Sequence, residues 1–358
     1  MTWTRFKRVD AAVVLLAGLA FLCAPRSAQA DKIHTTARVY PEASVRHFDG
    51  EFVIFSNAKG DPVARKLTDI EAIYIDSVDR FDEFNRAEQA FQQRRYDDAA
   101  QKYEKALGRA RGFWKNLIRI RYVQACDAAG DFDLAVKMYI TISQALPEKA
   151  DLFMPSNFKG VTAKRFDEAL RLLEETLPKI ADQRAYWQLE ALRLTILEQT
   201  ESDQAERIAR EVIARLRSHK GQDARYRLQI IAIRVEIKHG QHETALGHID
   251  EALSDAGERF LPQLMFLKGR CLYGLAQSRD EYVRAGLAFM RVVIHFPKST
   301  LCAQSMYMAG QVHEKISRIS KAIELYEGCK ELAGANDEVF RLADAALQSA
   351  EKLRSQSR

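Results

Sequence analysis

The sequence predicts a mainly α-helical fold in which a small β module precedes an array of similar helical hairpins. Three observations lead to this fold class. One helical phrase recurs along most of the chain, the segment before it is rich in β-branched and aromatic residues, and a single amphipathic stretch follows it. In the clearest copies of the phrase, an aromatic residue stands three positions before a small alanine, and a large residue stands four positions after it.

The phrase is clearest in residues 96–107, where Ala99, Tyr103 and Ala106 fall on one helical face. Successive copies are separated by 34 to 40 residues. Their alanines are Ala99, Ala135, Ala169, Ala205, Ala245, Ala285 and Ala322. Such a period is typical of stacked supersecondary units, because a lone hairpin cannot bury its apolar face and does so against its neighbours.

The pattern resembles the tetratricopeptide repeat family. The short turns at Asp131-Phe132 and Gly240-Gln241-His242 carry the resemblance, as do the closing prolines Pro147 and Pro297. The resemblance implies an α-solenoid of about seven hairpins over residues 81–335. A capping helix with a short tail is then expected over residues 336–358.

We expect the helices of the array to pair in sequence order. The predicted ranges are 81–93 with 97–110, 114–129 with 133–145, 184–199 with 203–217, 224–239 with 243–254, 261–276 with 281–294, and 301–316 with 320–332. The third hairpin departs from the pattern, because Pro155 and Gly160 interrupt its first helix and leave only 166–178. The hairpin around Ala205 is also atypical, since Ser202 stands where the aromatic residue is expected.

Residues 31–78 are expected to form the small β module. The predicted strands cover 32–40, 52–55 and 63–67, and Asp49-Gly50 provides a hairpin turn. Residues 68–75 are expected to close the module through a short turn followed by the last strand. This order is similar to that of SH3-like and Sm-like barrels, which implies a barrel-like module. Two interpretations stay open: a docking or oligomerising module, or an N-terminal cap for the array.

Residues 1–30 are predicted to be a secretory signal. A basic start precedes the uncharged apolar run 11–24, and Ala28-Gln29-Ala30 matches a cleavage site. We therefore expect export to the periplasm or the cell exterior, with an uncleaved anchor as the alternative. The net charge of the full chain is +5, and it falls when the basic start is removed. This balance and the lack of a binding motif exclude nucleic acid as a predicted partner.

No catalytic constellation is found in the sequence. Residues 242–246 begin like a metalloprotease H-E-x-x-H motif, but Leu246 occupies the position of the second histidine. Phosphate-binding glycine loops and nucleophile motifs are absent as well. The prediction is a non-enzymatic protein that needs no cofactor and no metal.

The chain also offers one candidate disulfide bridge. Cys302 begins one predicted helix and Cys329 lies near the end of the next, so an antiparallel hairpin would bring them together. The alternative is a pair of small buried core residues, because free cysteine is commonly buried.

The resemblance implies that the first helices line a concave surface that binds partners. Counting back from the alanines gives the candidate partner-binding residues Arg227, Arg234, Lys238, Phe266, Arg270, Tyr273, Tyr307 and Gln311. Guanidinium groups beside aromatic rings suit a protein or peptide with acidic groups. The alternative is a solvated charged face without a partner.

These features favour an exported scaffold that binds another protein or peptide in its concave groove. One alternative is a component of an envelope assembly or secretion complex with peripheral membrane association, since Phe296-Pro297-Lys298-Ser299 resembles a phrase of such repeat proteins. A second alternative is ligand or carbohydrate binding by the β module.

Overall fold

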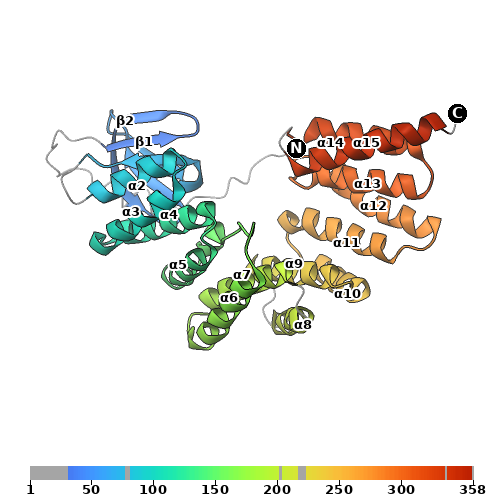
Figure 1. Ribbon diagram of the computed structural model, residues 1–358, viewed down its shortest axis with the longest axis horizontal. Helices are drawn as coiled ribbons and strands as arrows, with labels where there is room; N and C mark the ends of the chain where they lie inside the picture. Colours follow the sequence, from blue (N-terminus) through green and yellow to red (C-terminus); the bar gives the residue numbers. More distant parts are fainter. Residues whose placement is uncertain (1–30, 77–80, 201–203, 217–222, 335–336, 357–358) are drawn as a thin grey trace, which may run out of the picture. The chain divides into compact units, whose positions relative to one another are not determined.

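The computed structural model describes residues 31–76, 81–200, 204–216, 223–334 and 337–356, so the predicted signal at 1–30 lies outside the described residues. Within these ranges the chain is mainly helical, with one small antiparallel sheet near its N-terminal end (Figure 1). It forms two compact units that meet between Ile118 and Arg119, inside helix α4 (Phe113–Ala129).

The first unit contains a five-stranded sheet. Its strands are β1 (Asp31–Thr35), β2 (Val39–Phe48), β3 (Phe52–Ser56), β4 (Pro62–Lys66) and β5 (Ile70–Tyr74), with the 3-10 turn η2 (Leu67–Asp69) before the last strand. The spatial order is β4-β3-β2-β1-β5, and all neighbouring strands are antiparallel. Ile33, Val53, Phe55 and Ile73 are fully buried and form the apolar centre of this sheet.

The prediction of one strand over residues 32–40 is wrong, because the chain turns there. The Thr35 hydroxyl donates to the Arg38 carbonyl at 2.7 Å and accepts from the Arg38 amide at 3.0 Å, which ends β1. β2 then runs through Pro41, which lies where the register between β1 and β2 shifts. Proline is tolerated at such a bulge because its missing N–H interrupts no regular ladder.

The outer edge of β5 is closed by side chains of helix α2 (Asp82–Gln92). The Asn85 amide accepts from the Ile75 N–H and donates to the Ile75 carbonyl, both at 2.8 Å. One turn later, the fully buried Glu88 carboxylate accepts from the Ile73 N–H at 2.7 Å. Tyr103 of α3 (Tyr96–Arg109) donates to the same carboxylate at 2.5 Å. Edge groups that could pair with another chain are thus satisfied internally.

The second unit is built from helices that follow one another along the chain. After α4 come α5 (Phe132–Ala145), α6 (Ala163–Thr176), α7 (Gln183–Gln199), α8 (Gln204–Leu216), α9 (Asp223–Lys238), α10 (His242–Leu253), α11 (Leu261–Leu275), α12 (Arg279–His295), α13 (Cys302–Lys315), α14 (Ile319–Leu332) and α15 (Glu338–Gln356). The 3-10 turns are η3 (Ala150–Phe153), η4 (Leu177–Lys179) and η5 (Glu258–Phe260). Each of the predicted helices is present within about three residues of its expected ends.

The seven alanines of the recurring phrase are all buried, with exposed fractions of 0 to 5%. Each lies in the first half of a helix that packs on the helix before it or after it. Glycines permit similarly close contacts farther along the chain. A Cβ added at Gly269 of α11 would lie 2.6 Å from the Phe289 ring of α12, which is too close for a real contact. A Cβ added at Gly310 of α13 would clash in the same way with the Tyr326 ring of α14. Small residues therefore set the distance between paired helices.

Residues 147–162 replace the first helix of the third hairpin. This stretch contains only η3 and an extended loop before α6, and α7 packs against both α5 and α6. Among the residues that the structure describes, none of the helices combines the length and apolar character needed to cross a lipid bilayer.

Replacing Glu88 with alanine tests the closure of the β5 edge. It leaves the Ile73 N–H and the Tyr103 hydroxyl buried without their acceptor, so we expect a loss of about 2–4 kcal/mol of unfolding free energy. Hydrogen–deuterium exchange should show faster exchange in residues 70–75. Glu104→Ala, at an exposed position of α3, is the matched control and should change stability by less than about 0.5 kcal/mol. Equal exchange in the two variants would contradict this role of Glu88.

Candidate functional site

The structure separates the eight predicted partner-binding residues into two groups. Arg227, Arg234 and Lys238 lie on α9, and their side chains are exposed. Arg270 is exposed on α11, which packs on α9. Of the aromatic and amide residues, Phe266 and Tyr273 lie on α11, and Tyr307 and Gln311 lie on α13.

The cations of α9 are engaged by neighbouring segments. Arg227 forms an ion pair with Asp151 of η3. Arg234 holds the Glu198 carboxylate of α7 in a two-point contact of 2.8 and 2.7 Å. Lys238 donates to the backbone carbonyls of Glu198 and Thr200 at the C-terminal end of α7, where a cation also favours the helix dipole. The contacts of Arg234 and Lys238 hold α9 against α7, and the contact of Arg227 holds α9 against η3.

Arg270 differs from these cations, because it forms no ion pair with any described residue. Burial lowers the pKa of its guanidinium, and the like charge of nearby Arg234 lowers it further, while the Glu198 carboxylate that pairs with Arg234 acts in the opposite direction. His242 of α10 lies close by, and burial and the Arg270 charge lower the pKa of its imidazole. His242 is therefore uncharged at neutral pH and adds no counter-charge. Arg270 is a partly desolvated cation without a carboxylate partner.

A hollow of about 650 Å³ opens beside Arg234. It is lined by the loop Met154–Lys159, by Thr195 and Gln199 of α7, and by Ile231 and Arg234 of α9. Its described lining combines apolar groups with hydroxyl and amide groups and two cations, Arg234 and Lys159, and includes no carboxylate. The volume falls in the range of small-ligand and peptide side-chain sites.

The loop on one side of the hollow is fixed by Asp127 of α4. The Asp127 carboxylate accepts from the amides of Ser156 and Asn157 at 3.0 and 2.9 Å and from the Ser156 hydroxyl at 3.2 Å. The Asn157 side chain donates to the Asp127 carbonyl at 2.8 Å. The loop is therefore held in one conformation by hydrogen bonds from a neighbouring helix.

An aromatic cluster holds the same loop from the other side. The Phe158 ring lies 5.9 Å from Phe132 and 6.2 Å from Phe166, and the latter two rings lie 5.4 Å apart. Such edge and tilted contacts stabilise ring positions beyond simple burial. Together with Asp127, they preorganise the hollow before any ligand binds.

The sequence predicted Arg234 as a partner-binding residue, but no sequence pattern predicted the hollow beside it. The proline and glycine of the 154–160 stretch showed only that a helix was interrupted. The position of the loop depends on its contacts with Asp127 and Phe132, which are distant in sequence and carry no local signal.

The structure brings Tyr273, Tyr307 and Gln311 together. Gln311 donates to the Tyr307 hydroxyl at 2.9 Å. Burial raises the pKa of the Tyr273 hydroxyl, as do the neighbouring groups Tyr282 and Tyr307. Both tyrosines are half-buried, and their rings pack on Tyr282 and Tyr326 at 5.6 and 5.8 Å.

Phe266 is wrongly included among the partner-binding residues. Its side chain is only 5% exposed, and its ring lies 5.7 Å from Phe289. α11 packs against both α9 and α12, so at the level of Phe266 its surface is covered from two sides. The exposed residues of α11 are Gln263, Arg270 and Gly274.

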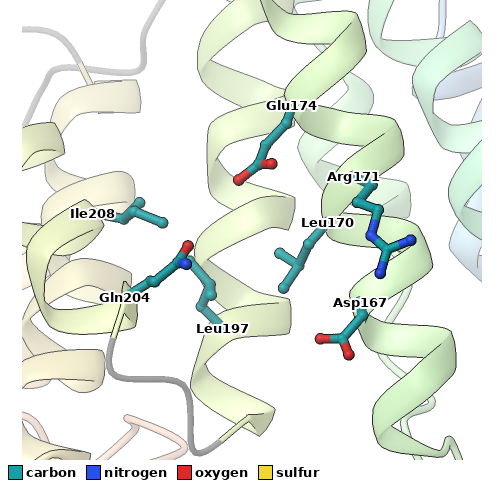
Figure 2. A pocket seen from close by; sticks show the side chains of 7 residues that line it. All are labelled: Asp167, Leu170, Arg171, Glu174, Leu197, Gln204 and Ile208. Carbon is teal, nitrogen blue, oxygen red and sulfur yellow. The ribbon is translucent and has the colours of Figure 1, made fainter.

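A smaller hollow of about 220 Å³ lies among α6, α7 and α8 (Figure 2). Its apolar lining comes from Leu170, Leu197 and Ile208, with Gln204 at one side. Its charged residues Asp167, Arg171 and Glu174 all lie on α6. Arg193 also pairs with Glu174 at 3.3 Å. Acidic groups exceed basic ones in this lining, so it lacks the cationic character of the hollow beside Arg234.

No protein-family model matches the chain, and no curated protein is similar to it at a significant level. Within the described ranges, no group of three or more histidine, cysteine or acidic residues is arranged to hold a metal ion.

The structure does not contain the predicted Cys302–Cys329 bridge. Both residues are buried free thiols, as are Cys126 and Cys271. Burial raises the pKa of Cys329 to about 11 and that of Cys271 to about 12. The antiparallel hairpin places these cysteines inside the helix packing, where they act as small core residues.

Alkylation with iodoacetamide tests this assignment. The reacting species is the thiolate, and the raised pKa values leave almost none at pH 8. We therefore expect slow labelling of the native protein, and labelling of all four cysteines beyond residue 30 after denaturation without reductant. Ser349→Cys, at an exposed position of α15, is the control and should label quickly in the native state. If Cys302 and Cys329 label only after reduction, the bridge exists.

Proposed function

We propose that this protein is a non-catalytic, exported binding protein that holds an acidic segment of another protein in the hollow beside Arg234. The observation that carries the proposal is the state of Arg270. It is a partly desolvated guanidinium that forms no ion pair with a described residue, and it lies near the Arg234–Glu198 pair. A carboxylate supplied by a ligand would give Arg270 charge-assisted hydrogen bonds.

The hollow supports a peptide rather than a small inorganic anion. Its lining adds Met154, Phe158 and Ile231 to the cations Lys159 and Arg234, so it offers apolar contact as well as positive charge. Hydroxyl and amide groups from Ser156, Thr195 and Gln199 can pair with peptide backbone groups. A segment with alternating acidic and apolar side chains fits this combination.

The half-buried tyrosines extend the proposed surface along α11 and α13. Tyr273 lies one helical turn from Arg270, so ring and guanidinium are neighbours on α11. Aromatic and arginine side chains are the usual anchors of protein interfaces. We place Tyr273, Tyr307 and Gln311 at the far end of the bound segment.

The proposed architecture is a solenoid of the tetratricopeptide repeat type. The even spacing of the buried alanines and the sequential packing of α11 to α15 support it (Figure 1). The predicted signal at residues 1–30 supports export. The described lining of the hollow has no histidine, cysteine or carboxylate that could act as a nucleophile or general base, which supports a binding role.

Peptide binding tests the proposal. The probe is a fluorescein-labelled pool of twelve-residue peptides with Asp or Glu at alternate positions, compared with a pool carrying Asn or Gln there. We expect the acidic pool to bind more tightly, and added salt to weaken it. Arg270→Gln should reduce affinity about tenfold and Arg234→Gln with Arg270→Gln still more, since each removes a charge-assisted contact.

Arg207→Gln on α8 is the matched control, because Arg207 is 60% exposed and pairs only with Glu211 among the described residues. It should leave peptide affinity unchanged. Circular dichroism should show that each variant keeps its helix content. Equal binding of the two pools, or unchanged affinity in the Arg270→Gln variant, would contradict the proposal.

A further inference from the structure

Helix α12 has an exposed apolar stripe on the face opposite its buried side. Val283, Leu287 and Ile294 are 37, 57 and 65% exposed, and Met290 lies between the last two, where its half-buried side chain also packs against the hydrophobic core. No other helix of the described chain has three large apolar side chains at this level of exposure. Single exposed leucines need no explanation, but a continuous row of four apolar residues does.

The four residues follow the spacing of a coiled-coil seam. The intervals from Val283 to Leu287, Met290 and Ile294 are four, three and four residues, which is the alternation of the a and d positions of a heptad. The stripe is about 16 Å long at the usual helical rise. It is confined to these positions, and a stripe this narrow is typical of a seam between two helices.

The helix that carries the stripe is firmly held. Ser278 and Glu281 form a reciprocal capping box at its N-terminal end. Its other face buries Ala285, Phe289 and Val292, and α12 packs on both α11 and α13. Gly286 lets α13 approach closely, since a Cβ there would lie 3.0 Å from Val312. The stripe therefore lies on a rigid element whose packing within the unit is already complete.

Charges along one flank of the stripe indicate the partner. Arg284 and Arg291 stand one position after Val283 and Met290, at the e positions of the same heptads. Neither arginine forms an ion pair with a described residue. The nearby Glu281 carboxylate accepts hydrogen bonds from the amides of Gln277 and Ser278. A partner helix with glutamate beside its apolar seam would pair with both guanidinium groups.

We propose that α12 docks an amphipathic helix of another protein that has leucine or isoleucine at its a and d positions and acidic residues beside them. A second copy of this chain fits poorly, because antiparallel pairing of two α12 stripes would place Arg284 opposite Arg291 of the other copy. An anionic membrane surface also fits poorly, because binding in the lipid interface needs a wider apolar face than four residues in one row.

This surface is distinct from the cationic hollow, and the two proposals can fail separately. The probe is a synthetic three-heptad helical peptide with leucine at a and d and glutamate at e and g. Fluorescence anisotropy of the labelled peptide with the purified protein gives its Kd. The comparison peptide has lysine at e and g. We expect the glutamate peptide to bind, and the lysine peptide to bind at least about tenfold more weakly.

Two pairs of substitutions localise the binding. Leu287→Ser with Ile294→Ser should weaken the glutamate peptide at least about tenfold, because it removes the centre and one end of the seam. Arg284→Glu with Arg291→Glu should reverse the preference in favour of the lysine peptide. Leu342→Ser with Leu353→Ser on α15, where the leucines are 44 and 47% exposed, is the matched control and should change neither affinity.

The Arg234→Gln/Arg270→Gln variant should bind the glutamate helix as tightly as the unchanged protein does. Loss of binding in that variant would assign the helix to the cationic hollow and overturn the α12 proposal. Equal binding of the two peptides would overturn it as well. The α12 proposal would also be overturned if sedimentation showed a dimer that is lost on replacement of Leu287. Binding to phosphatidylglycerol vesicles that is lost on the same replacement would overturn it too.

Discussion

The close approach of paired helices at small residues is the constraint on which the rest of the structure depends. Ala205, Ala245 and Ala285 are fully buried, and the glycine at 269 leaves room for the Phe289 ring of the next helix. A larger side chain at such a position would force the helices apart, since protein interiors are closely packed.

The candidate site arises where this regular packing is interrupted. Residues 147–162 form no full helix, and the loop that replaces it is held by Asp127 on one side and by Phe132 and Phe166 on the other. The missing helix leaves a hollow that α7 and α9 line with Thr195, Gln199 and Arg234. The regular helices thus provide the frame, and the irregular hairpin provides the space for a ligand.

Much of the fold could be predicted from the sequence, because the helical period and the alanine spacing are local signals. The division of residues 32–40 into two strands was missed, since it depends on the Thr35 hydroxyl closing a turn with Arg38. Phe266 was misplaced because its burial is decided by two neighbouring helices that one helix's pattern does not describe. Of the site, the cations were predicted and the hollow was not, because the contacts that shape it join segments far apart in sequence.

The most direct test of this account is hydrogen–deuterium exchange of the purified protein with and without the acidic peptide pool. A rigid frame with one preorganised hollow predicts added protection in residues 154–159 and in the part of α9 around Arg234. Exchange in α2 and α3 should stay the same, and so should exchange at the buried helix contacts of α13 and α14. Protection confined to other segments, or a general change across all the helices, would contradict the account.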